Sequence, residues 1–117
     1  MNIGATVEYD FGDRIAWGEI GPKSVYDWST YKWCNGLETT LTKYNSDSEY
    51  GIVDEKSFIE VEDDAASVNW GELWRIPTVD DCAELNRCTW THATIEGVDG
   101  SLVTGPNGNS IFIPSVN

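Results

Sequence analysis

The sequence has few of the residues on which catalytic and metal chemistry usually depends. Its 117 residues include one histidine, His92, and three cysteines, with no Cys-x-x-Cys pair. These residues do not make up a structural zinc site. No serine or cysteine lies in a recognisable nucleophile motif, and paired acids such as Asp63 and Asp64 are typical of a helix start. We therefore predict a non-catalytic protein with no cofactor and no bound metal, and an enzyme is the least favoured interpretation.

Long hydrophobic runs are also missing. No apolar stretch approaches the 18 or so residues of a membrane-spanning helix, so membrane insertion is not expected. The first residues lack the basic start and apolar core of a signal peptide. Localisation stays open between a cytosolic protein and one whose leader has been removed. The odd set Cys34, Cys82 and Cys88 leaves the redox state open too, because one disulfide with one free thiol and three free thiols are both compatible with it.

Basic residues are scarce. Seven lysines and arginines stand against 20 acids, which gives a net charge of −13. A chain with no cationic footprint is not expected to bind nucleic acid directly, and it is repelled by anionic membrane surfaces. The charge favours solubility or a cationic protein partner.

Aromatic residues, in contrast, are abundant: six Trp, five Tyr and three Phe. Most large rings pack in a core, but exposed rings are what a carbohydrate or protein site uses. Five rings gather between residues 17 and 33, in a stretch whose spacing fits neither a helix nor a strand. We predict that this cluster is the ligand-binding surface, with core packing as the alternative. Its members are Trp17, Tyr26, Trp28, Tyr31 and Trp33.

The middle of the chain is acidic. Residues 45–57 look like a polar surface loop, and they fail the calcium-loop pattern because Tyr50 and Lys56 stand where glycine and glutamate are needed. The acids there and at the following helix start form a predicted contact face for a cationic partner. That face consists of Asp54, Glu55, Glu60, Glu62, Asp63 and Asp64.

The stretch 62–78, EDDAASVNWGELWRIPT, organises the chain. Acids at its start and Gly71 beyond its end predict a helix over residues 60–68. Thr78, with Asp81 three residues later, predicts a capping box that opens a second helix ending near residue 87, with Cys82 facing inward. Between the helices, we predict that Arg75 forms a structural ion pair with Asp63 or Asp64, and stacking on a tryptophan ring and ligand binding are the alternatives.

The last third alternates between apolar and polar residues. Strands are predicted over 88–95, 101–104 and 110–113, with turns at 97–100 and 105–108. Two short helices followed by an antiparallel β meander make an α+β fold. The length predicts a single domain over 1–117.

Several segments of the chain resemble the Fibrobacter succinogenes major paralogous domain family. They are AWGE at 16–19, YKWCNG at 31–36, EDDAA at 62–66 with NWG at 69–71, WRIPT at 74–78 and NGNSIF at 107–112. These uncommon segments occur in the family's order and extend from about residue 12 to 114. The resemblance implies a partial C-type-lectin-like architecture, related more distantly to formylglycine-generating-enzyme-like domains. Because members of the family continue past the Ile-Phe-x-Pro point, it also implies a form shortened at the C-terminus. Without the family's final strands, the 110–113 strand would be an exposed edge, which predicts a homodimer through it.

The resemblance and the aromatic cluster together predict a binding module of a bacterial surface or secreted protein, which recognises a glycan or a protein. The alternative is a small acidic inhibitor from a phage or mobile element, of the anti-CRISPR or nucleic-acid-mimic kind. Such a protein would occupy a cationic groove and would be cytoplasmic.

Overall fold

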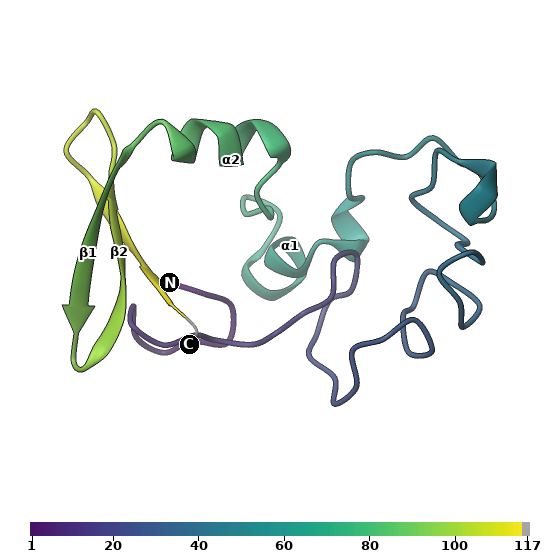
Figure 1. Ribbon diagram of the computed structural model, residues 1–117, viewed down its shortest axis with the longest axis horizontal. Helices are drawn as coiled ribbons and strands as arrows, with labels where there is room; N and C mark the ends of the chain where they lie inside the picture. The colour runs from purple at the N-terminus through teal and green to yellow at the C-terminus, as the bar shows by residue number, and fades with distance from the viewer. Residues whose placement is uncertain (116–117) are drawn as a thin grey trace. The chain divides into compact units, whose positions relative to one another are not determined.

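The computed structural model describes residues 1–115 (Figure 1). The chain divides into two compact units. We call Arg14–Ile76 the cleft unit, and Met1–Asp13 together with the residues from Pro77 onward the sheet unit. The prediction of a single domain came from length alone and stays a prediction. No helix in the described part of the chain is long and apolar enough to cross a membrane.

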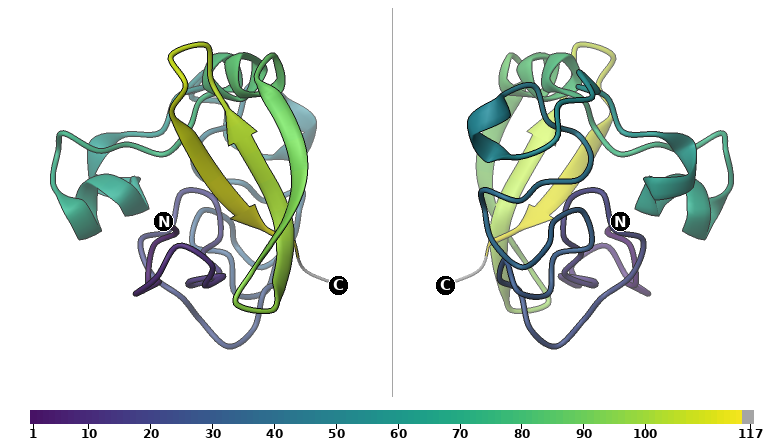
Figure 2. Two further views of the ribbon diagram at one scale, coloured as in Figure 1. Left: turned by 90° about the vertical axis from the view of Figure 1, so that its left-hand side faces the viewer. Right: turned by 90° about the vertical axis from the view of Figure 1, so that its right-hand side faces the viewer.

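The sheet unit contains one helix and one sheet. The helix is α2, Val79–Asn86, and the strands are β1, Thr89–Ile95, β2, Val98–Thr104, and β3, Ser110–Pro114. The strands are antiparallel in the order β1-β2-β3, so β2 lies in the middle (Figure 2). Together with the second short helix, α1, of the cleft unit, this sheet confirms the predicted α+β class and the predicted meander.

The first hairpin is tighter than predicted. Residues Val98 to Gly100 belong to β2, and the turn consists of Glu96 and Gly97 alone. Both have positive φ, 48° and 80°, as a two-residue turn that matches the twist of its strands requires. Gly100 is needed for packing, since a Cβ there would lie 2.6 Å from the Phe112 ring and 2.4 Å from the Ile113 carbonyl oxygen. Phe112 and Val103 are the buried apolar side chains of this sheet.

The capping box of α2 is confirmed. The Thr78 hydroxyl accepts from the Asp81 N–H at 3.2 Å, and the Asp81 carboxylate accepts from the Thr78 N–H at 2.8 Å. The helix ends at Asn86, close to the predicted end. The prediction that Cys82 faces inward is wrong, because Cys82 is exposed. None of the side chains of α2 is fully buried.

The cleft unit has little regular structure. Its elements are two single-turn 3-10 helices, Ser48–Tyr50 and Val61–Asp63, and the helix α1, Ala65–Trp70. The predicted helix over 60–68 is therefore split, because Asp64 has extended backbone and caps α1 with its side chain. Isolated β-bridges join Leu41 to Cys34 and to Gly51, and residues 14–76 contain no strand.

Polar side chains fill much of the interior of the cleft unit. Asn45, Asp63, Asp64 and Ser67 are buried beside Ala65 and Ala66. No buried side-chain nitrogen or oxygen among the described residues lacks a hydrogen-bond partner. Trp70 and Trp74 lie outside the core: they pack edge to face at 5.3 Å but are 40% and 56% exposed.

Asp64 ties the organising stretch together. Its carboxylate accepts from the N–H groups of Ala66 and Ser67 at 2.9 and 3.1 Å, and from the Ile76 N–H at 3.0 Å. The Ser67 hydroxyl donates to the Trp74 carbonyl at 2.7 Å. The start of α1 and the segment that leads to α2 are thus linked by backbone N–H groups that donate to Asp64. The Arg75 guanidinium donates to the carbonyl of Ile76, and its predicted ion pair stays a prediction.

Candidate functional site

The cleft unit contains an open cleft of about 470 Å³, which we call the aromatic cleft. Five rings, two lysines and one aspartate line it together with two small or aliphatic residues. The lining residues are Ala16, Trp17, Lys23, Tyr26, Asp27, Trp28, Tyr31, Leu41, Lys43 and Tyr44. All come from the 16–44 segment, so the site is complete within one unit.

Four of the five predicted ligand-binding rings line this cleft. Trp17, Tyr26 and Trp28 are 48%, 45% and 46% exposed, and Tyr31 is half-buried. Trp33 is not among the lining residues; its indole N–H donates to the Gly18 carbonyl at 2.7 Å. The cluster therefore separates into four rings that can contact a ligand and one that supports them.

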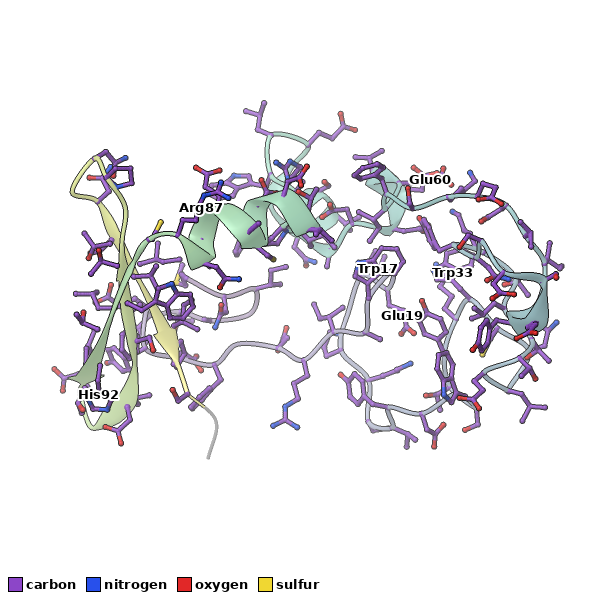
Figure 3. The ribbon with its side chains drawn as sticks, turned by 45° about the horizontal axis from the view of Figure 1, so that its top comes forward. Trp17, Glu19, Trp33, Glu60, Arg87 and His92 are labelled. Carbon is purple, nitrogen blue, oxygen red and sulfur yellow. The ribbon has the colours of Figure 1, made fainter. Side chains whose placement is uncertain are left out.

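Trp17 and Trp33 both pack on Tyr44. Their rings meet the Tyr44 ring edge to face, at 4.8 Å and 6.2 Å between centroids. Gly18, which follows Trp17, has a φ of 83°, and a Cβ there would lie 3.1 Å from the Trp33 ring. Figure 3 labels Trp17 and Trp33 among the surrounding side chains. This packing fixes the Trp17 end of the cleft.

Hydrogen bonds hold the other rings. The Tyr31 hydroxyl donates to the Trp17 carbonyl at 2.9 Å, and the Trp28 ring meets the Tyr31 ring at 5.7 Å. The Tyr26 hydroxyl donates to the Arg14 carbonyl and accepts from the Lys23 N–H at 3.0 Å. Burial, and then the nearby Glu19, raises the pKa of Tyr31, so this hydroxyl stays a donor at neutral pH.

Both lysines of the cleft are paired with acids. Lys23 Nζ lies 2.9 Å from Glu19 Oε2 and 5.5 Å from the centre of the Tyr26 ring. Lys43 Nζ lies 2.6 Å from Asp63 Oδ2 and 3.0 Å from Glu60 Oε1. Each ammonium charge is therefore compensated within the protein.

Lys43, Tyr44 and Asp63 form one network. The Tyr44 hydroxyl donates to Asp63 Oδ2 at 2.6 Å, and Lys43 also lies 5.0 Å from the Tyr44 ring centre. The hydrogen bond to Asp63 raises the pKa of Lys43. Burial would raise the pKa of Asp63, but the bonds from Lys43 and Tyr44 bring it below its usual value. The pKa of Tyr44 is raised by burial and by Asp63.

The predicted acidic contact face needs correction. Asp63 and Asp64 are buried, at 3% and 2% exposure, because they serve Lys43 and the start of α1. Asp54 accepts the N–H groups of Tyr44 and Asn45, which brings its pKa below its usual value although burial opposes this. Glu60 is half-buried against Lys43 and Lys56. Of the predicted set, Glu55 and Glu62 alone are exposed.

Six of the ten lining residues were not identified from the sequence, and four of these six have a charged or aromatic side chain: Lys23, Asp27, Lys43 and Tyr44. Their only signal in the sequence is their position, within or close after the ring-rich stretch. No local pattern marks Lys43, whose side chain bonds Asp63, 20 residues later.

A second cleft of about 420 Å³ lies in the sheet unit, between Arg87, Thr104 and Pro106, and no aromatic ring lines it. Among residues 1–115, no group of three His, Cys, Asp or Glu side chains could hold a metal ion.

Neither a family model, nor a curated protein, nor a solved structure matches this chain.

Proposed function

We propose that this chain is a non-catalytic binding module and that the aromatic cleft binds a glycan. The observation that carries the proposal is the gathering of Trp17, Tyr26, Trp28 and Tyr31 around one open cleft, with charged side chains between them. The family resemblance supports the lectin-like part of the proposal and the placement on a bacterial surface or in a secreted protein.

The cleft has the chemistry that sugars require. Tyr and Trp rings give large, rigid contact areas at a low cost in conformational entropy. Pyranose rings have an apolar C–H face that can lie on such a ring, while their hydroxyls need hydrogen-bond partners. Lys23 and Asp27 line the same cleft and can supply them.

The charge balance favours a neutral glycan over an acidic one. Lys23 and Lys43 are both held by carboxylates within 3.0 Å, and the whole chain carries −13. An anionic sugar would gain little from lysines that are already paired, and the field of the chain would repel it.

A glycan array followed by calorimetry tests this proposal, with Trp28→Ala as the test variant. Its ring lines the cleft, so its removal should weaken binding about tenfold or more. Trp74→Ala is the matched control: it lies in the same unit, is 56% exposed and does not line the cleft. A blank array, or equal losses in both variants, would contradict the proposal.

The acidic inhibitor is the second candidate, and the net charge of −13 is the observation that favours it. After the correction above, Glu55 and Glu62 are the predicted acids that remain available to a cationic groove. Such binding should weaken steeply as salt rises. An affinity for a basic nuclease that stays the same between low and high salt would eliminate this candidate.

A further inference from the structure

The sheet has two edges, β1 and β3, and the backbone bonds show which groups face outward. The Ser115 N–H donates to the Asp99 carbonyl at 2.9 Å, continuing the β2–β3 register. Hydrogen-bonded pairs alternate along an antiparallel ladder. Ile111 and Ile113 are therefore bonded to β2, and the backbone groups of Ser110, Phe112 and Pro114 face away from it.

The β3 edge is poorly suited to pairing. Pro114 has no N–H, so only Ser110 and Phe112 offer donors on this edge. Proline on an edge is a common way in which proteins block further strand addition. The homodimer that the sequence predicts through residues 110–113 is therefore disfavoured by the strand itself.

The β1 edge is open along its whole length. By the same alternation, the backbone groups of the even-numbered residues of β2 point toward β1. Their partners Thr91 and Ala93 therefore bond to β2, and the backbone groups of Trp90, His92 and Thr94 face outward. Within residues 1–115, no other strand pairs with β1, and no hydrogen bond reaches the backbone N–H of these three residues. The strand has no proline, lysine, arginine or acid, and it is rich in β-formers. Proline, lysine and inward-pointing acids, which commonly protect an edge strand, are therefore absent from β1.

We propose that β1 pairs antiparallel with β1 of a second copy, centred on His92, to form a continuous six-stranded sheet. In this register, Trp90 faces Thr94 of the second copy and His92 faces its own counterpart. On the opposite face, Thr91 faces Ala93. The backbone N–H and C=O groups of each outward residue then bond to those of the residue opposite in the second copy, because the same groups face outward on both copies.

A second copy fits this edge because the strand is self-complementary. Its seven residues carry no acid and no lysine or arginine, so the pairing brings no like charges of that kind together. Aromatic and β-branched side chains face one another across the pair, which favours antiparallel association. The remaining opposition is long-range, from the net charge of −13 on each copy. Added salt screens that repulsion and should strengthen the dimer.

Proline substitutions distinguish the two edges. His92→Pro removes an outward donor and blocks strand addition, while the inward bonds to β2 remain. Ser110→Pro makes the same change on the outer edge of β3. Sedimentation equilibrium up to roughly 1 mM protein in about 0.5 M salt, a range in which the Debye length falls below about 5 Å, should show a dimer for the wild type and for Ser110→Pro, and a monomer for His92→Pro.

His92→Glu provides a second variant that keeps the backbone donor and places two carboxylates opposite each other at the centre of the dimer. It should also be monomeric, with the far-ultraviolet circular dichroism of the wild type. A wild type that stays monomeric, including one that instead captures an extended peptide of another protein, would overturn the proposal. So would a dimer that survives both His92 variants, or one that only Ser110→Pro abolishes.

Discussion

The two units of this protein are stabilised in different ways. The sheet unit depends on a regular backbone ladder, a capping box and the apolar side chains Val103 and Phe112. The cleft unit has almost no ladder and depends on buried polar side chains that reach across the sequence. Asp64 accepts N–H groups from both sides of α1, and Asp63 joins Lys43 to Tyr44. The unit with less regular structure is the one that displays the candidate site.

The difference suggests why the aromatic cleft can be open. Rings that were needed for the core would have to be buried, but here Asn45, Asp63 and Asp64 occupy much of the interior. Trp17 and Trp28 remain nearly half exposed while hydrogen bonds and ring contacts hold their surroundings. A polar interior thus allows aromatic surface to be kept for a ligand.

The largest expected effect comes from Asp64→Ala. The change leaves the buried N–H groups of Ala66 and Ser67, and the partly buried N–H of Ile76, without their acceptor, which should cost roughly 3 kcal/mol or more. Five of the six tryptophans lie in the cleft unit, so their fluorescence should show an earlier transition in urea. Asp80→Ala, in the exposed first turn of α2, is the control and should cost under about 1 kcal/mol. Equal losses in the two variants would contradict the role of Asp64.

The second largest effect should be a loss of stability of the cleft unit at low pH. Lys56 and then Lys43 lower the pKa of Glu60 from 4.5 to about 2, and the pKa of Asp63 is also below its ordinary 3.8. Both groups therefore bind fewer protons folded than unfolded, so their contribution is present above about pH 4.5 and is lost as the pH falls toward 2.

Tryptophan fluorescence followed from pH 7 to pH 2 checks this dependence, because the backbone ladder of the sheet unit does not titrate. Asp63→Asn should flatten the lower part of the curve, since the amide cannot be protonated there. A fluorescence signal that is flat down to pH 2 in the wild type would show that these ion pairs contribute nothing.

Gly100→Ala should affect the opposite unit. The added Cβ meets the Ile113 carbonyl and the Phe112 ring at under 3.0 Å, so the sheet must shift, at a cost of about 1–3 kcal/mol. Circular dichroism should report the loss, while ligand binding at the aromatic cleft should stay unchanged. Gly21→Ala, where an added Cβ meets nothing within 4 Å, is the control.

The smallest effect should be a gain in stability. Glu96 has φ of 48° in the β1–β2 turn, a conformation that asparagine adopts more readily than glutamate. Glu96→Asn should stabilise the sheet unit by roughly 0.5 kcal/mol, measured as a later thermal transition. A lower transition temperature would show that the glutamate side chain has a role that the turn geometry does not explain.

The same contrast explains what the sequence could predict. The alternation of residues 88–95, the turn signals and the Thr78 and Asp81 pair are local patterns, and each led to an element that is present. The missed residues, Lys43 and Tyr44, act through Asp63, about 20 positions away, and no local period encodes such a contact. The ring cluster could be located from composition, but its division into four lining rings and the supporting Trp33 depends on packing.

Hydrogen exchange read by mass spectrometry tests the central contrast most directly. Asp64→Ala should remove protection from peptides of residues 14–76 and leave residues 89–104 protected, and Gly100→Ala should do the reverse. The expectation follows from the separate stabilisation of the two units, the first by buried polar side chains and the second by its ladder. Equal loss of protection across both units in either variant would contradict it, because the two units would then unfold together and would not be stabilised separately.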